Sequence, residues 1–256
     1  MNHPAPNPQA MASVGFKIKG QEFSIEATVS VPAGLTRTAD LLPLAQGLSD
    51  RVVHETAKAL EATGNRISCR KGCGACCSNL VAISEVEARH IAEVVTEMPA
   101  QRQAEIRSRF AAARQRLEIA GLLPLLEQSA GWTDGDYTQL VADYFKERLP
   151  CPFLEAGSCS IYENRPITCR EFLVVSPPEY CAEDDSKDVV QVRLLLPVFH
   201  AVAQWQTKPP KHLMERVVPL ILALEWAEKH PEAAPCRTGP ELLKELLNLL
   251  QIKREL

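Results

Sequence analysis

The cysteines of this 256-residue chain are gathered into two blocks, and this clustering constrains the fold more than any other feature of the sequence. The first block, residues 69–77, carries four thiols in a short run, and Gly72 and Gly74 leave its backbone free to turn. The second block, residues 151–181, carries four more. The fold therefore has to bring together two segments that lie far apart in the sequence.

Cysteine usage of this kind favours metal or redox chemistry. Scattered free cysteines are usually small buried hydrophobic residues, but dense clustering argues against that interpretation. The N-terminus carries three prolines and no basic stretch followed by an apolar run, so the sequence predicts no secretory signal. We expect a cytoplasmic protein, in which stable disulfides are rare. The ninth cysteine, Cys236, stands alone in a proline-rich stretch, and we predict that it is not a ligand.

The adjacent pair Cys76-Cys77 limits the geometry of a site. Neighbouring side chains diverge from the backbone and do not easily fill two corners of one tetrahedron, so the two thiols are expected to serve different centres. Two alternatives follow: two separate four-cysteine sites, or one iron-sulfur cluster held by four thiolates with the others left for redox work or a second metal. The predicted metal ligands are Cys69, Cys73, Cys76, Cys77, Cys151, Cys159, Cys169 and Cys181.

Four basic residues lie in or beside these blocks. A four-thiolate zinc site and an oxidised four-iron cluster each carry a formal charge of about -2, which nearby cations would offset. Arginine and lysine N-H groups also hydrogen-bond to sulfur. The alternative is that these residues are solvated surface cations. The candidates are Arg70, Lys71, Arg165 and Arg170.

Outside the cysteine blocks, the apolar pattern predicts a mainly α-helical fold with a small N-terminal β-hairpin. Apolar and polar residues alternate from Val14 to Val31 around Gly20-Gln21, as in a hairpin. Ser84 and Glu87 have the spacing of a capping box and open a predicted helix that ends near Glu97. Helical spacing predicts further helices over residues 38–62, 100–119, 122–128, 136–148, 187–205, 211–229 and 240–254.

These patterns divide the chain into four regions. We expect a disordered lead over residues 1–12, a hairpin plus helix over 13–66, a cysteine-cluster metal-binding region over 67–182, and C-terminal helices over 183–256 packed on it. The predicted architecture is a helical body that carries an irregular cysteine-rich metal-binding lobe.

Charge and motifs exclude several function classes. A net charge of -4 and a pI near 5.9 provide no basic field for nucleic acid. Apolar stretches such as residues 217–224 are far shorter than the roughly 20 residues of a membrane span. No phosphate-binding or serine-hydrolase motif occurs, and the histidines lack a catalytic zinc pattern, so no reaction is assigned. His90 follows the first block on its predicted helix, and we predict that it is not a ligand.

The cysteine blocks resemble the zinc- or iron-chelating family of bacterial cysteine-cluster proteins, known as the YkgJ-like or CxxCxxCC family. One match is the run from Gly72 to Cys77, and the other is Cys151-Pro-Phe-Leu leading through Cys159, Tyr162, Arg165-Pro166 and Cys169-Arg170. Three residues separate Cys69 from Cys73, where the family spacing has two. The resemblance covers residues 66–182 and implies chelation of zinc or iron.

Three functions are compatible with the sequence. The first is a metal-binding protein whose fold depends on zinc or iron held by thiolates. The second is an iron-sulfur redox enzyme component, suggested by the Cys76-Cys77 pair. The third is a metal-stabilised adaptor that binds a protein partner through the C-terminal helices, suggested by the leucines of residues 242–250. Docking of those leucines on the protein's own core is the simpler interpretation of the last helix, and we favour it.

Overall fold

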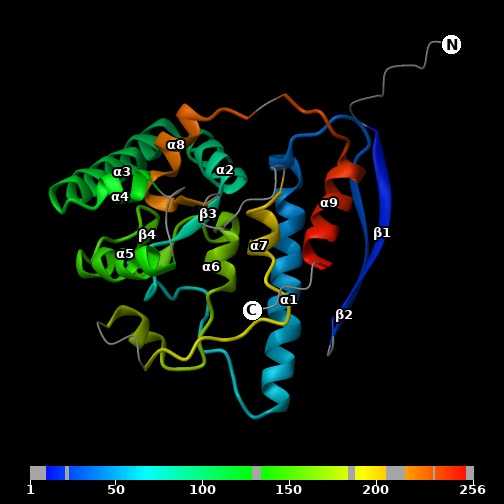
Figure 1. Ribbon diagram of the computed structural model, residues 1–256, viewed down its shortest axis with the longest axis horizontal. Coiled ribbons are helices and arrows are strands. Elements are labelled where there is room, and N and C mark those ends of the chain that lie inside the picture. Colours follow the sequence, from blue (N-terminus) through cyan, green and yellow to red (C-terminus); the bar gives the residue numbers. More distant parts are fainter. Residues whose placement is uncertain are drawn as a thin grey trace.

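The computed structural model describes residues 10–20, 23–128, 134–183, 188–205, 217–232 and 234–251. Within them the long helix α1 (Leu42–Ala62) runs through the middle of the molecule. An N-terminal hairpin and the last helix lie on one side of α1, and a group of helices lies on the other side (Figure 1). The predicted mainly helical fold is therefore confirmed.

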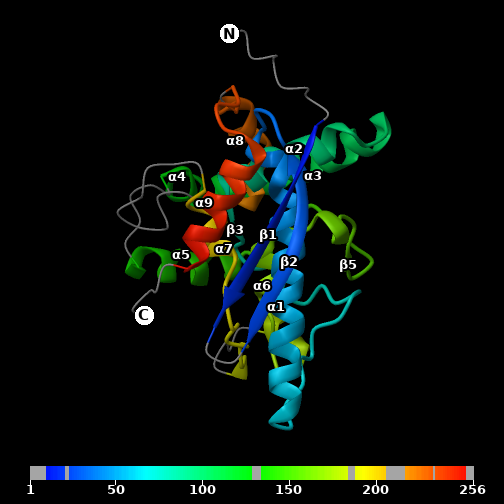
Figure 2. The same ribbon diagram turned by 90° about the vertical axis from the view of Figure 1, so that its right-hand side faces the viewer.

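The predicted hairpin is present, and its alternating residues explain how it packs. Strands β1 (Met11–Lys19) and β2 (Ser24–Pro32) pair antiparallel, with Met11 opposite Pro32 and Lys19 opposite Ser24. Ile18, Ile25 and Val31 point inward and are buried, because side chains alternate between the two faces of a strand. Figure 2 shows both strands lying over α1 and beside the last helix. Strand β1 begins within the segment predicted as a lead, of which residues 1–9 lie outside the described residues.

The last helix, α9 (Gly239–Gln251), contributes the leucines of this core. Leu242, Leu243, Leu246 and Leu250 are buried against the hairpin and α1, so most of the leucine face docks internally. Trp205 Nε1 donates to the carbonyl oxygen of Leu242, 3.1 Å away. Docking on the core, the interpretation we favoured, is confirmed. The predicted end of this helix at residue 254 lies outside the described residues.

The helices beyond α1 form a second and a third apolar cluster. They are α2 (Glu85–Thr96), α3 (Ala100–Ile119), α4 (Leu123–Glu127), α5 (Asp134–Lys146) and α8 (Ala223–Lys229). The capping box predicted for α2 is confirmed: Ser84 Oγ accepts from Glu87 N, and the Glu87 carboxylate accepts from Ser84 N. Ile83, Ile91, Ile106 and Phe110 are buried where α2 and α3 meet.

Two predicted helices were wrong in part. Residues 188–198 contain no α-helix, and only the short α7 (Phe199–Val202) follows. In the predicted helix over 211–229, Val217–Pro219 form strand β6, which pairs antiparallel with β3 (Ala82–Ser84). Pro197 and Pro219 contribute to both errors, because proline removes a backbone donor and clashes with the preceding helical turn. Residues 187 and 211–216 lie outside the described part of the chain.

The remaining elements are short and belong to the cysteine-rich part. They are β4 (Leu154–Glu155), β5 (Ser158–Cys159) and α6 (Ile167–Glu171), with 3₁₀ turns at Tyr162–Asn164 and Pro178–Ala182. Among the described helices, none is long and apolar enough to cross a membrane.

Candidate metal centre

The first cysteine block is an irregular loop between α1 and β3. Backbone hydrogen bonds fold it into successive turns: Cys73 N donates to Arg70 O, and Cys77 N donates to Gly74 O, each over 3.0 Å. Gly72 has a φ of +91°, a conformation that residues with a Cβ adopt only with strain. The glycine predicted to let this loop turn is therefore required at that position.

The second block is built on a tight hairpin and a short helix. Strands β4 and β5 pair with Leu154 opposite Cys159, and the two residues that join them, Ala156 and Gly157, both have positive φ, as in a type I′ turn. Cys151 precedes β4, and Cys159 ends β5. Cys169 lies on α6, and Cys181 lies in the 3₁₀ turn Pro178–Ala182.

Helix α3 holds the β4–β5 hairpin in place. Phe153 packs edge-on against Phe110, with ring centroids 5.5 Å apart. Arg109 Nη1 donates to Pro152 O over 3.1 Å, and both Arg109 and Arg102 pair with Glu155. These arginines lower the pKa of the Glu155 carboxyl. The arginine-rich face of α3 thus positions the hairpin that carries Cys159.

The two blocks meet through their backbones. Cys151 N donates to Cys77 O over 2.7 Å, and Ser68 N donates to Val174 O over 2.8 Å. A Cβ added to Gly74 would lie 2.5 Å from Gly157 O, so the first loop approaches the hairpin turn of the second block directly. The fold therefore brings together the two segments that the sequence separates.

Three of the cysteine sulfurs accept backbone N-H groups of other residues. Val174 N donates to Cys69 Sγ over 3.4 Å. Backbone hydrogen bonds from Phe153 to Cys151 and from Ile161 to Cys159 lower the pKa of each thiol. An N-H group aimed at sulfur favours the thiolate, which is the form that binds a metal. This pattern is therefore typical of cysteines held ready as ligands.

The adjacent thiols of Cys76 and Cys77 share a hydrogen bond. The Cys77 thiol donates to the Cys76 sulfur, and this lowers the pKa of Cys76 to about 7 while raising that of Cys77. The Arg165 guanidinium lowers the pKa of Cys76 further. Near neutral pH, Cys76 is therefore partly ionised beside a protonated Cys77.

Burial and mutual repulsion raise the pKa values of most other thiols in the cluster. Burial is the main cause at Cys151, where the pKa rises to about 12, and at Cys181, where it rises to about 11. Ionised neighbours add to the effect at both positions and at Cys169, whose pKa lies well above its ordinary value. A cation placed among these thiols would offset the repulsion, and thiolate donors suit zinc and iron. The donor set therefore fits the predicted metal.

The four basic residues predicted to offset the thiolate charge have different surroundings in the structure. Arg165 lies over the Tyr162 ring, 4.2 Å from its centroid, and lowers the pKa values of Cys69, Cys76 and Cys159. Lys71 pairs instead with Glu163. Arg170 is buried and pairs with Asp50 of α1 through both carboxylate oxygens. Arg70 is exposed.

The arrangement of the thiols is open. Within the described residues, no three His, Cys, Asp or Glu side chains converge closely enough to hold a metal ion. Cys181 is buried, the other seven predicted ligands are partly exposed, and Cys236 is exposed. His90 is hydrogen-bonded to Asn164. The thiols are thus gathered within electrostatic reach of one another without converging on a common point.

Sequence reasoning missed two acidic residues that position the second block. Glu87 Oε1 accepts from Ile167 N over 2.6 Å, so the carboxylate that completes the capping box of α2 also holds the start of α6. Glu171 at the end of α6 accepts from Val198 N and Ser49 Oγ. The capping box gave a signal for Glu87, but no local pattern marks the partners of Glu171.

A helical body that presents two cysteine loops in contact, with N-H groups aimed at three of the sulfurs, is compatible with a thiolate metal-binding protein. Comparison with known families agrees. Residues 68–189 match the CxxCxxCC family, described as a "Putative zinc- or iron-chelating domain". The resemblance inferred from the two motifs is therefore confirmed. No curated protein and no solved structure matches the chain.

Replacing Arg165 with glutamine should raise the pKa of Cys76 in the metal-free protein, because the variant lacks a charge that stabilises the thiolate. Alkylation of Cys76 at neutral pH should then slow about twofold, measured by mass spectrometry of its peptide. Arg70→Gln is the matched control, because Arg70 is an exposed arginine of the first block. Equal alkylation rates in wild type and Arg165→Gln would contradict the electrostatic role of Arg165.

Proposed function

We propose that this protein chelates zinc or iron through its eight clustered cysteines, arranged as two four-thiolate sets. One set is Cys69, Cys73, Cys76 and Cys181, and the other is Cys77, Cys151, Cys159 and Cys169. The observation that carries the proposal is the meeting of the two loops through Cys151 N and Cys77 O. It places the first and second blocks against each other with their thiols in mutual electrostatic reach.

Electrostatic contacts among the thiols support the division into two sets. Ionised Cys76, Cys69 and Cys73 raise the pKa of Cys181. In the same way, Cys151 and Cys169 raise the pKa of Cys77, and Cys151 and Cys159 raise that of Cys169. Cys76 also acts on thiols of the second set, so the two sets adjoin at the Cys76-Cys77 pair. Adjacent side chains that diverge suit neighbouring centres better than one centre.

Each residue group has a distinct role in this arrangement. The eight thiolates would hold the metal, and the positive charge of the bound ion would offset the repulsion among them. Arg165 offsets the remaining negative charge from outside the thiolates. The N-H groups of Val174, Phe153 and Ile161 orient three of the sulfurs.

Metal content of single cysteine variants tests the two sets. Anaerobically purified wild type should contain about two zinc ions or two iron-sulfur clusters per chain. Cys181→Ser should lose one centre and Cys159→Ser the other, so each variant keeps about half of the metal, and the double variant keeps none. Cys236→Ser, at the exposed cysteine outside both blocks, is the matched control and should keep all of it.

Other outcomes would count against the proposal in different ways. Complete loss of metal in either single variant, from a wild type with one centre, would replace two sets with one. Metal content below a tenth of an equivalent in anaerobic wild type would contradict chelation itself, taking about one equivalent as the least a single site binds.

Iron-sulfur redox chemistry is the second candidate function, and the shared proton of Cys76 and Cys77 is the observation that favours it. Acid-labile sulfide in the same samples separates the two candidates. Iron with equal sulfide, and visible absorption bleached by dithionite, would support a redox cluster. Zinc without sulfide would indicate closed thiolate sites with a structural or storage role.

A further inference from the structure

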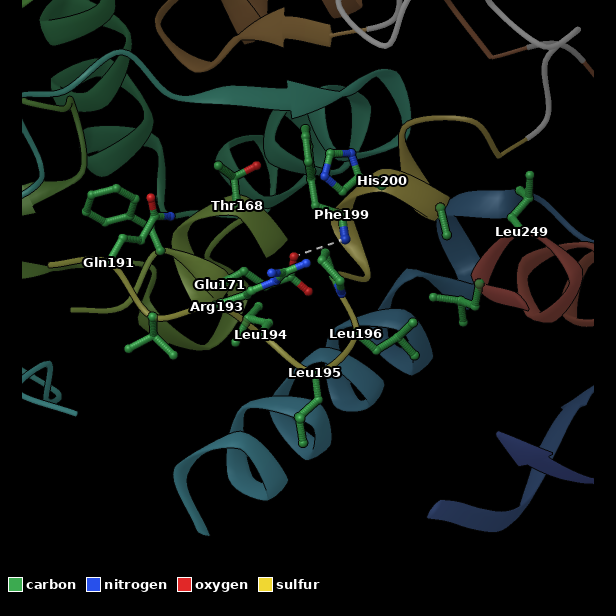
Figure 3. A pocket seen from close by; sticks show the side chains of 15 residues that line it. Thr168, Glu171, Gln191, Arg193, Leu194, Leu195, Leu196, Phe199, His200 and Leu249 are labelled. Carbon is green, nitrogen blue, oxygen red and sulfur yellow. Dashed lines mark hydrogen bonds between the residues drawn. The ribbon is translucent and has the colours of Figure 1, made fainter. Parts of the chain in front are cut away.

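A cavity of about 700 Å³ lies beside α6. It is lined by α6, the extended segment 191–197, α7 and the end of α9 (Figure 3). Thr168 and Glu171 of α6 line it, together with Phe172 just after the helix. Small-molecule sites usually have volumes of about 300 to 1,000 Å³, so the cavity is large enough for a ligand.

Most of the cavity wall is apolar. The segment 194–197 contributes three leucines and a proline, and Phe199 adds an aromatic ring. Leu249 and Leu250 close the end beside α9. A ligand that fills this space gains affinity by removing apolar surface from water. Its body should therefore be apolar.

Glu171 places a carboxylate in this wall. Its side chain is about nine-tenths buried. Oε1 accepts from Val198 N over 2.7 Å and from Ser49 Oγ over 3.1 Å, and Oε2 accepts only from Phe199 N over 3.2 Å. Among the described residues no cation pairs with it. Oε2 therefore retains capacity to accept another hydrogen bond.

Arg193 brings the opposite charge to the same cavity. Its guanidinium has no hydrogen-bond or ion-pair partner among the residues that the structure describes. In the view of Figure 3, the side chains of Glu171 and Arg193 occupy the middle of the lining with the leucines around them. One cavity thus presents an acid and a base that are not paired with each other.

We propose that this cavity binds a short zwitterionic peptide with apolar side chains, of about dipeptide size. The ligand's ammonium group donates to Glu171 Oε2, and its carboxylate accepts from Arg193. A purely anionic ligand would bring its charge beside the Glu171 carboxylate, and a purely cationic one would face Arg193. A zwitterion satisfies both groups, and apolar side chains fill the leucine-lined space.

The dipeptide leucyl-leucine is the probe, and isothermal titration calorimetry with the metal-loaded full-length protein is the measurement. N-acetylation removes the ammonium group, and amidation of the C-terminus removes the carboxylate. We expect each blocked peptide to bind at least about tenfold more weakly than leucyl-leucine, since a charge-assisted hydrogen bond contributes at least this factor.

Variants of Arg193 complete the test. Arg193→Gln should weaken leucyl-leucine binding about tenfold but leave the affinity for the amidated peptide unchanged, because that peptide lacks the group that Arg193 binds. Arg193→Lys should keep part of the affinity. Arg66→Gln is the matched control, because Arg66 is exposed and does not line the cavity.

Two results would overturn the proposal. One is the absence of binding by leucyl-leucine at millimolar concentration, and the other is equal binding of the free and blocked peptides. Metal content is measured on the same samples, so a protein that holds its metal but binds no peptide refutes only this inference. A protein that binds the peptide without metal separates the cavity from the proposed chelation.

Discussion

Replacing Glu87 with alanine is expected to lower the free energy of unfolding by about 3 kcal/mol or more. The Glu87 side chain is almost fully buried, and its carboxylate accepts from Ser84 N, Ser84 Oγ and Ile167 N at distances of 2.6 to 2.9 Å. Alanine removes the acceptor and leaves these buried donors unpaired. Each unpaired buried donor costs about 1 to 3 kcal/mol.

The loss should extend to the metal centre, because Glu87 holds the first turn of the helix that carries Cys169. Ile167 N opens α6, and it donates to the Glu87 carboxylate. The Glu87 charge also lies near Arg170, which ties α6 to Asp50 of α1. We therefore expect Glu87→Ala to lose metal from the set that contains Cys169 as well as stability.

Urea unfolding followed by circular dichroism measures the effect, with metal content determined beforehand. Glu85→Ala is the matched control: Glu85 lies in the same first turn of α2, but its side chain is 36% exposed and its contact with Arg89 is long, 3.6 Å. Its loss should change stability by less than about 0.5 kcal/mol. Equal stabilities of Glu87→Ala and wild type would contradict the role of Glu87 in joining α2 to α6.

Local sequence patterns predicted the elements whose stability is local. The alternation from Val14 to Val31 is the periodicity of a hairpin, and each inward residue of β1 and β2 finds α1 or α9 as its cover. The capping box of Ser84 and Glu87 satisfies backbone groups of α2 alone, so four residues suffice to recognise it. Both elements can therefore be recognised from neighbouring residues, although the hairpin still needs α1 and α9 to cover its apolar face.

The errors came where a distant partner decides the conformation. Val217 and Val218 were assigned to a helix from their spacing, but they pair with β3, a strand that lies far away in the sequence. Val190 N donates to Ser176 Oγ and Val192 N donates to Leu173 O, so the segment near residue 190 is extended along the second block. Periodicity contains no information about such partners.

The sequence predicted the residue types of the candidate centre, but it did not predict the contacts that hold the two cysteine blocks together. Cysteine spacing predicted eight thiol ligands in two blocks, because ligands of one site cluster in sequence, and the fold brings these two blocks together. Two contacts that hold the centre together could not be predicted from any sequence motif. They are the hydrogen bond from Cys151 N to Cys77 O and the ion pair between Arg170 and Asp50. The sequence suggested that four cations offset the negative charge of the thiolates. In the structure, Arg165 is the one that lowers the pKa values of Cys69, Cys76 and Cys159.

Replacing Gly74 with alanine is expected to weaken metal binding roughly ten- to a hundredfold, the range typical of changes beside a metal ligand shell. The new Cβ would lie 2.5 Å from Gly157 O and 2.6 Å from Leu154 Cδ1. The leucine tip can move, but the carbonyl belongs to a tight turn in which Ala156 and Gly157 already have positive φ. The loop that carries Cys73 and Cys76 must therefore move away from the hairpin that carries Cys159.

The control for Gly74→Ala is Gly47→Ala in helix α1. A Cβ at Gly47 meets no other atom within 4 Å, so this substitution should raise stability by up to about 1 kcal/mol through helix propensity and leave metal content unchanged. Competition with a chromogenic chelator gives the metal affinity of each variant. Because each block holds cysteines of both proposed sets, separation of the loops should weaken both centres together. Loss of only one centre would show that one set closes without the other loop, and unchanged affinity would show that close contact between the loops is not needed to bind metal.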